Sequence, residues 1–235
     1  HRFKRFGHQC FIFFWQRRRR NVVFGIIVDR GIESYEQTHQ AMKDQIAVLK
    51  GGMRAELWCV QHPPVFTQGQ AGKAEHVLDP GDTRIVQSDR GGQVTYHGPG
   101  QIILYTLIPL KNFGLSVRDL VRLLENTVIA QLAYYGIEAK AWSESPGVYV
   151  DDKKIASLGL RIRHGVSFHG IAVNVNMDLE PFSRINPCGH PGLEVVQISD
   201  LIGDTRLEHV AKGLSGHLKQ ELLALASHRM TGKTK

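Results

Sequence analysis

The sequence predicts an α+β fold, with a mixed, largely antiparallel sheet and helices packed against it. Two observations support this prediction. Short apolar, β-branched runs form a block separated mostly by hairpin-like turns, and helical patterns occur before, within and after that block. Strands and helices do not alternate regularly, as they would in a doubly wound parallel sheet. No internal repeat or interdomain linker is evident, so a single domain is expected.

The first predicted elements are a strand, a helix and a second strand. Residues 22–28 are an apolar, β-branched run typical of a strand. Ser34 is a helix N-cap, and apolar side chains then recur at spacings of three and four until Gly51 and Gly52 end the helix. Its inward side chains are expected to be Tyr35, His39, Met42, Ile46 and Leu49. Ala55–Gln61 comes next as an alternating strand.

A proline pair at residues 62–64 terminates that strand, and a glycine-rich segment comes after it. Residues 66–73 are expected to be a loop interrupted by glycine, because glycine and proline are the residues that most strongly end helices and strands. Three more strands are then predicted from runs of β-prone residues. They lie at residues 85–88, 94–96 and 101–109.

A long helix is predicted after these strands. Ser116, with Asp119 three residues later, forms a capping box, and Gly136 stops the helix. Apolar side chains recur along one face, as in a helix that packs against a sheet. The stripe contains Leu120, Leu123, Leu124, Thr127, Val128 and Leu132.

Short turns then predict an antiparallel meander. The turns lie at residues 151–153 and 164–166, and hairpins of this length join neighbouring strands. The strands are expected at residues 137–139, 147–150, 155–163 and 168–176.

The C-terminal part begins with a proline-bearing loop at residues 178–192. Thr205 and Glu208 then have the spacing of a capping box, which predicts the start of a final helix. Apolar residues recur along that helix at positions expected to face inward. They are Val210, Leu214, Leu218, Leu222 and Leu225.

The charge of the chain is concentrated at its N-terminus. The formal net charge is +7, and residues 1–28 hold seven basic residues and no acidic one. Residues 29–235 contain 22 basic and 22 acidic residues, so this part is formally neutral and does not favour a nucleic-acid-binding module. Residues 1–21 are expected to be a basic, disordered extension, residues 22–228 the folded domain and residues 229–235 a tail.

The cysteines and the N-terminal apolar run suggest a cytoplasmic protein. Cys10, Cys59 and Cys188 have no paired spacing, so neither a disulfide framework nor a zinc site is expected. The apolar run at residues 10–15 is six residues long, far below the roughly 20 needed to span a bilayer. Its basic residues come after rather than before it, unlike those of a secretory signal. A reducing cytoplasm is therefore expected.

A glycine-rich stretch at residues 90–101 is the first candidate for a site. It holds four glycines and a proline around a short β-prone segment. Glycine serves where the backbone turns tightly or where a ligand lies against it. Arg90, Tyr96 and His97 are polar groups that such a loop could present. On this stretch alone, two ordinary turns flanking a strand explain the pattern equally well.

The second candidate is Cys188, on a turn between proline and glycine. A thiol on such a turn is accessible, as nucleophilic cysteines are, whereas Cys59 lies in an apolar strand that suits packing. A cysteine at its ordinary pKa needs a nearby cation or base to act at neutral pH. The residues alone leave several activating groups open. They are Lys154, His97, His169 and His190.

Five segments together resemble the lipoyl(octanoyl) transferase family. They are residues 62–70, 90–101, 154–161, 168–175 and 178–189, and the resemblance covers roughly residues 25–204 in the same order. It implies a fold similar to the catalytic domain of biotin and lipoate protein ligases. The activity that it implies is transfer of an octanoyl or lipoyl group from acyl carrier protein to a specific lysine, the first step of endogenous protein lipoylation.

The resemblance also implies partners and site residues. The acceptors would be lipoyl domains of 2-oxo-acid dehydrogenases and the glycine-cleavage H protein, acting with a monomeric enzyme that needs no metal or cofactor. Cys188 would carry the acyl thioester, Lys154 would favour the thiolate, and His169 would support the site. The substrate-binding residues would be Arg90, Gly91, Gly92, Gln93, Val94, Thr95, Tyr96, His97, Ser157, Leu158, Gly159, Gly170, Ile171 and Ala172.

Three other functions compete with this one. An ATP-dependent lipoate–protein ligase has a similar fold and loop, but it activates its acid as an adenylate and has no need of a cysteine at position 188. A Cys–His hydrolase would deliver the acyl group to water rather than to an amine. A nucleic-acid-binding module would have to rely on the basic N-terminal segment, since the rest of the chain is neutral.

Overall fold

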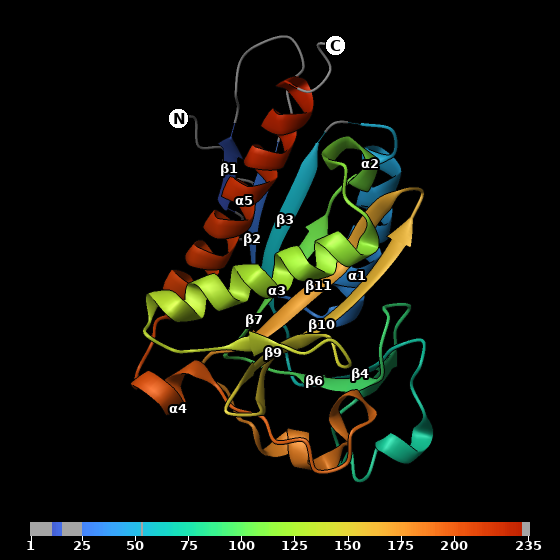
Figure 1. The fold of residues 1–235 in the computed structure, drawn as a ribbon. Coiled ribbons are helices and arrows are strands. Elements are labelled where there is room, and N and C mark those ends of the chain that lie inside the picture. Colours follow the sequence, from blue (N-terminus) through green and yellow to red (C-terminus); the bar gives the residue numbers. More distant parts are fainter. Residues whose placement is uncertain (1–10, 16–24, 53, 232–235) are drawn as a thin grey trace.

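The computed structural model describes residues 11–15, 25–52 and 54–231 (Figure 1). Its strands are β1 (Phe11–Trp15), β2 (Gly25–Ile32), β3 (Ala55–Gln61), β4 (Val65–Gln68), β5 (Ile85–Gln87), β6 (Val94–His97), β7 (Gln101–Leu107), β8 (Lys140–Ala141), β9 (Gly147–Val150), β10 (Lys153–Arg163) and β11 (Val166–Asn174). Its helices are α1 (Tyr35–Leu49), α2 (Leu110–Phe113), α3 (Val117–Tyr134), α4 (Ile198–Ile202) and α5 (Leu207–Thr231), with 3₁₀ turns η1 (Ala74–His76), η2 (Glu180–Arg184) and η3 (Pro187–Gly189).

The described strands form two sheets. The larger has the order β1-β2-β3-β7-β11-β10-β9-β8, and the smaller has the order β5-β4-β6. In the larger sheet β2 and β3 run parallel, and every other neighbouring pair is antiparallel. The predicted α+β class with a mixed, largely antiparallel sheet is therefore confirmed.

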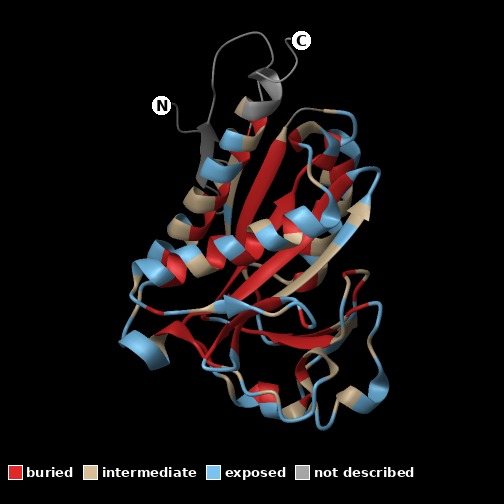
Figure 2. Ribbon diagram, viewed as in Figure 1, coloured by how far each residue is buried: buried red, intermediate tan, exposed pale blue. Residues whose placement is uncertain are grey.

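The central strands are buried on both faces because helices cover both (Figures 1 and 2). Alternation sends Leu57 and Leu104 into a core shared with α3 and α5. It sends Trp58 and Ile103 to the opposite face, where Met42 of α1 packs. The predicted strand at residues 55–61 is confirmed, but it has no polar face.

The predicted caps hold for two helices and fail for the third. Ser34 caps α1, and Ser116 with Asp119 forms the complete capping box of α3. The capping box predicted at Thr205 and Glu208 is wrong. The helix begins at Leu207, and the Thr205 hydroxyl donates to the carbonyl of Gly203 in the preceding turn. The inward stripe of α5 is buried as expected, except that Ala226 replaces Leu225 at its end.

Several short elements escape the sequence patterns. β4 overlaps the segment expected to be a loop at residues 66–73, α2 and α4 are not predicted, and η2 and η3 lie in the long loop expected at residues 178–192. The strand expected at residues 137–139 is wrong, and its place is taken by β8 three residues later. These elements have two to five residues, too few to show a hydrophobic period.

The predicted meander is confirmed, and its turn geometry is visible in the backbone. Asp151 and Asp152 have φ angles of 45° and 64°, and His164 and Gly165 have 52° and 78°. Two consecutive positive φ angles are typical of the hairpin turns that match the twist of antiparallel strands. β9, β10 and β11 therefore lie side by side in sequence order.

The chain ends differ in how much is described. β1 pairs antiparallel with β2, so part of the segment expected to be an extension lies against the main sheet, and α5 runs on to Thr231. The N-terminal arginine run and residues 22–24 of the first predicted strand lie outside the described residues. Across the described part of the chain, no helix combines the length and apolar character that a membrane crossing needs.

The contact between β7 and β11 leaves no room for a side chain at Gly170. A Cβ atom there would lie 2.0 Å from the Leu104 carbonyl oxygen. We expect Gly170→Ala to lower the free energy of unfolding by at least the roughly 1–3 kcal/mol of an overpacked core. Urea unfolding measures this change. Gly136→Ala is the control, since nothing lies within 4 Å there and only its positive φ is strained. A smaller loss in Gly170→Ala than in the control would contradict the packing.

Candidate active site

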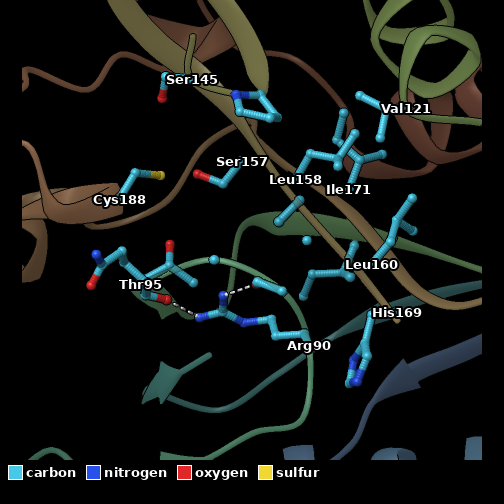
Figure 3. A pocket seen from close by; sticks show the side chains of 18 of the residues that line it. Arg90, Thr95, Val121, Ser145, Ser157, Leu158, Leu160, His169, Ile171 and Cys188 are labelled. Carbon is cyan, nitrogen blue, oxygen red and sulfur yellow. Dashed lines mark hydrogen bonds between the residues drawn. The ribbon is translucent and has the colours of Figure 1, made fainter. Parts of the chain in front are cut away.

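A cavity of about 350 Å³ lies between the glycine-rich loop and strands β10 and β11 (Figure 3). Nearly every residue predicted for the site lines it. The lining includes Cys188, His169, Arg90, Gly91, Gly92, Gln93, Val94, Thr95, His97, Ser157, Leu158, Gly159, Gly170, Ile171 and Ala172. The sequence did not point to Tyr35, Ile103, Tyr105, Val117, Val121, Glu144, Ser145, Pro146 or Leu160, which also line it.

Tyr96 is the predicted binding residue that lies outside the cavity lining. Alternation along β6 sends Tyr96 and Val94 toward a third, smaller hydrophobic core, which we call the third core. There the Tyr96 ring packs against Phe66 and Phe182. The same alternation sends Thr95 and His97 to the other side of the strand.

The two ends of the cavity differ in chemical character. Cys188, Ser157 and Thr95 lie at one end, and Val121, Ile171 and other apolar side chains lie at the opposite end (Figure 3). A thiol therefore lies at one end of an apolar space, an arrangement suited to a ligand with a polar head and an apolar tail.

Cys188 occupies a constrained turn that both flanks anchor. Its φ of 56° lies in the left-handed region, which costs a residue with a side chain about 1–3 kcal/mol. Upstream, the Asn186 N–H donates to the carbonyl of His76 at 2.8 Å. Downstream, the N–H of Lys154 donates to Glu194 and that of Val196 donates to Lys154, so residues 194–196 run beside the start of β10. These anchors bring the turn to Lys154.

Lys154 is a buried cation in direct contact with the thiol. Its side chain is 1% exposed, and Nζ lies 2.8 Å from Cys188 Sγ. The other two ammonium protons reach the Pro146 carbonyl at 3.3 Å and Ser145 Oγ at 3.5 Å. Lys153, its neighbour, points away and pairs with Glu194 at 2.6 Å. The strand thus sends the two lysines to opposite faces, as alternation requires.

The residues around Lys154 come from β9 and the turn before it. Tyr149 pairs with Lys154 across the hairpin, its ring lies 5.2 Å from Nζ, and its hydroxyl donates to Ser145. Gly147 makes room for the lysine, because a Cβ atom there would lie 2.9 Å from Lys154 Cε. A two-residue turn at Asp151 and Asp152 sets this register, so the pairing of Tyr149 with Lys154 could have been read from the sequence.

Two opposing effects act on the pKa of Lys154. Burial acts to lower it, while the charge of Cys188 as a thiolate, its hydrogen bond and Tyr149 act to raise it. The net direction is upward, so the free protein holds an ammonium beside the sulfur. A cation at this distance favours thiolate over thiol.

Arg90 braces the loop from within. It is buried, and its guanidinium donates to the Thr67 carbonyl at 2.6 Å and to the Gln93 carbonyl at 2.8 Å, with further bonds to Thr67 Oγ1 and Gly91. Burial lowers its pKa. Its donors are occupied by loop and β4 atoms, so it shapes the cavity wall rather than reaching into the cavity.

The histidines considered as activating groups differ from Lys154 in charge. Burial lowers the pKa of His97 to about 3 and that of His169 to about 4, so both are neutral at pH 7. His97 bonds to Gln101 and Thr67, away from the sulfur. His190 is exposed and also lines the cavity, but among the described residues the hydrogen bond to the Cys188 sulfur comes from Lys154. Among the groups left open by the sequence, Lys154 is the one that the structure brings into contact with Cys188.

His39, Asp89 and His169 form a group whose ligand atoms lie within 4.8 Å of one another. Asp89 Oδ1 accepts from His39 Nε2 at 2.7 Å and from His169 Nε2 at 2.9 Å. The bond from His169 is the largest cause that holds the pKa of Asp89 below its usual range. These bonds link α1, the loop and β11. Both imidazoles would have to release Asp89 before the group could hold a cation.

The sequence of the chain matches one family. The family model for the lipoyl protein ligase A/B catalytic domain matches residues 35–219. The octanoyltransferase of Pseudomonas syringae pv. syringae (strain B728a) is 54% identical over 205 residues, covering 87% of this chain and 94% of that protein. The octanoyltransferase of Shewanella frigidimarina (strain NCIMB 400) is 58% identical over 173 residues, covering 74% and 80%. The chain belongs to this ligase-type catalytic-domain family and, within it, to the octanoyltransferases.

Solved structures show the same fold at low sequence identity. The bi-partite lipoate protein ligase of Thermoplasma acidophilum matches with a TM-score of 0.64 and 15% identity, covering 84% of this chain and 88% of that chain. A biotin protein ligase from Aquifex aeolicus matches with a TM-score of 0.51 and 14% identity, covering 86% and 70%. The predicted resemblance to the fold of biotin and lipoate protein ligases is thereby confirmed.

Alkylation of Cys188 tests the contact with Lys154. We expect Lys154→Ala to move the pH profile of Cys188 alkylation by iodoacetamide toward higher pH, since the sulfur loses the ammonium that contacts it at 2.8 Å. Lys153→Ala is the control and should leave the profile in place, because Lys153 pairs with Glu194. If the control moves the profile and Lys154→Ala does not, the roles of the two lysines are reversed.

The buried histidines make stability depend on pH. Burial lowers the pKa of His62, His97 and His169. The unfolded chain binds protons at these positions near pH 6.5 while the folded protein does not, so acidification favours unfolding. We expect the free energy of unfolding in urea to fall between pH 7 and pH 5, by up to about 1.4 kcal/mol per pH unit for each histidine. His209→Gln, at an exposed position, should leave the slope unchanged. Equal stability at the two pH values would contradict this.

Proposed function

We propose that the protein transfers an octanoyl or lipoyl group from acyl carrier protein to the specific lysine of lipoyl domains, through a thioester on Cys188. The observation that carries this proposal is the 2.8 Å contact between Lys154 Nζ and Cys188 Sγ at the head of an apolar cavity. Relatives at 54% and 58% identity are named octanoyltransferase, which supports the choice of acyl group.

In the first half of the reaction, the Cys188 thiolate attacks the carbonyl carbon of the carrier thioester. A new C–S bond forms, the carrier C–S bond breaks, and the carrier leaves as a thiolate. Thioester exchange joins groups of similar leaving ability, so the acyl-enzyme is neither a trap nor a costly step. The carrier thiolate takes a proton from Lys154 and departs as a thiol.

The change of charge on Cys188 determines when Lys154 gives its proton to the carrier thiolate. A thiolate raises the pKa of Lys154 and opposes the effect of burial. Acylation turns the sulfur into a neutral thioester, so the effect of burial is no longer opposed by that charge. The pKa of Lys154 then falls, and the ammonium becomes a better acid at the moment when the leaving thiolate needs a proton.

In the second half, the neutral amine of the acceptor lysine attacks the thioester. The C–N bond forms, the bond to Cys188 breaks, and the excess proton on nitrogen passes to the neutral amine of Lys154. The products are an amide and the original pair of thiolate and ammonium. The cycle requires a proton carrier that can lose its proton, which a guanidinium at this position could not do.

The apolar end of the cavity suits the acyl chain. Val121 of α3, Leu158 and Leu160 of β10 and Ile171 of β11 line that end. Burial of an eight-carbon chain there stabilises its binding by about 0.8 kcal/mol per methylene group. In this proposal the carbonyl group lies at the Cys188 end and the tail lies against α3 and the sheet.

The partners are inferred from the reaction and from the relatives. The donor is octanoyl-acyl carrier protein, and the acceptors are lipoyl domains of 2-oxo-acid dehydrogenases and the glycine-cleavage H protein. The bi-partite lipoate protein ligase of Thermoplasma acidophilum, which has the same fold, belongs to a lipoylation system with its E2 lipoyl domain. We propose a cytoplasmic, monomeric enzyme whose catalytic domain, predicted at residues 22–228, also includes β1 and the end of α5.

Intact mass after mixing with octanoyl-carrier protein, without ATP, tests the intermediate. We expect one octanoyl adduct on the wild type and none on Cys188→Ser, whose fold should be retained because a half-buried turn residue is replaced by a near-isostere. Cys59→Ala is the matched control and should keep the adduct, since burial raises the pKa of Cys59 to about 12 and leaves it inert.

Three outcomes would overturn the proposal. An adduct on Cys188→Ser formed at the wild-type rate would move the nucleophile elsewhere. An adduct that requires ATP and free octanoate would indicate a ligase. Octanoate released to water in the presence of a lipoyl domain would indicate a hydrolase.

A further inference from the structure

The cavity gathers buried polar atoms that have no partner in the protein. In the described part of the chain, four buried side-chain polar atoms make no hydrogen bond. Arg54 Nε is one, and the other three belong to residues that line the cavity: Gln93 Oε1, Thr95 Oγ1 and His169 Nδ1. Unpaired buried polar atoms are rare and costly, so their concentration around one cavity indicates that a bound molecule supplies the partners.

Thr95 is the member of this set that lies beside the nucleophile and can donate. It is 5% exposed and lies at the Cys188 end of the cavity (Figure 3). Its strand, β6, packs against η3, which carries Cys188. Gln93 Oε1 can only accept a hydrogen bond. His169 lies away from the sulfur, toward Leu160 (Figure 3).

The backbone fixes the direction of the Thr95 hydroxyl. Thr95 pairs with Thr67 across the small sheet, and alternation turns its side chain away from the third core. Thr67 faces the same side, but its hydroxyl already bonds to Arg90 and His97. The Thr95 hydroxyl is thus held in place with its hydrogen-bonding capacity unused.

We propose that the Thr95 hydroxyl donates a hydrogen bond to the carbonyl oxygen of the acyl group during its transfer to and from Cys188. This inference rests on the proposed function. When the thiolate forms its bond to the carbonyl carbon, the π electron pair moves onto oxygen, and Thr95 stabilises that charge. When the pair returns, the carrier C–S bond breaks and the carrier sulfur takes the Lys154 proton. Thr95 keeps its own proton throughout.

The test compares Thr95→Val with Thr95→Ser. Valine keeps the shape and removes the hydroxyl, so we expect kcat for octanoyl transfer to fall about 10²–10³-fold, the usual loss of one oxyanion donor, with KM changed only a few-fold. Serine should restore most of the rate. Thr127→Val is the matched control: its buried hydroxyl bonds to Leu123 on α3, outside the cavity, and its loss should leave kcat unchanged.

Two readouts separate this role from a structural one. The infrared carbonyl stretch of an octanoyl-enzyme labelled with carbon-13 should lie at higher wavenumber in Thr95→Val than in the wild type, because a hydrogen bond weakens the C=O bond. The thermal unfolding midpoint of Thr95→Val should equal or exceed that of the wild type, since the variant loses an unpaired buried hydroxyl. A merely structural threonine would lower it.

The outcomes distinguish this inference from the proposed function. In the alkylation of Cys188 by iodoacetamide the sulfur does not attack a carbonyl carbon. The rate of alkylation should therefore be unchanged in Thr95→Val. Full transfer activity or an unshifted carbonyl stretch in Thr95→Val overturns the inference and leaves the Cys188 thioester standing. A loss of transfer in Gln93→Met with none in Thr95→Val would assign the donor to the amide instead. No adduct on the wild type would refute the proposed function itself.

Discussion

The site depends on a buried ammonium that must have an acceptor for each of its three protons. Removing such a charge from water costs several kcal/mol unless hydrogen bonds and an opposite charge replace the solvent. At Lys154 the Cys188 sulfur supplies one acceptor, and the Pro146 carbonyl and Ser145 Oγ supply the others. Burial and the pairing with sulfur are therefore a single requirement: without the cysteine turn, the lysine would be an uncompensated charge in the protein interior.

Meeting that requirement needs segments from both sides of β10. The hairpin with β9 places Tyr149 beside Lys154, and residues 194–196 run along the other edge at the start of the strand. A register shift between Lys154 and Ala156 interrupts the pairing of β10 with β9 directly after the lysine. The lysine thus belongs to a rigid strand, while the cysteine belongs to a turn held at both flanks. Such a site can be well defined in geometry although Cys188 lies on a loop.

How much of the structure the sequence could predict depends on how local each cause is. The Ser34 and Ser116 caps, the meander and the opposite directions of Lys153 and Lys154 depend on neighbouring residues, and they were predictable. The contact between Lys154 and Cys188 spans 34 residues and a loop without period, so residue chemistry alone left three histidines as rivals. Only burial, which lowers the pKa of His97 and His169, and the observed contact decide between them. Thr205 shows the converse, because a correct capping pattern lost to the turn that precedes it.

Several features of the free protein at this site cost free energy of folding. Cys188 and His169 have left-handed backbone angles, and polar atoms of Gln93 and Thr95 are buried without partners. Interactions that form only as the carbonyl carbon is attacked lower the activation barrier of the reaction without stabilising the bound substrate. A partnered Thr95 would stabilise the empty protein and would have to release its bond before assisting the reaction. In the role proposed for Thr95, leaving the hydroxyl unpaired lowers stability slightly but keeps that donor ready for the charge that develops on oxygen.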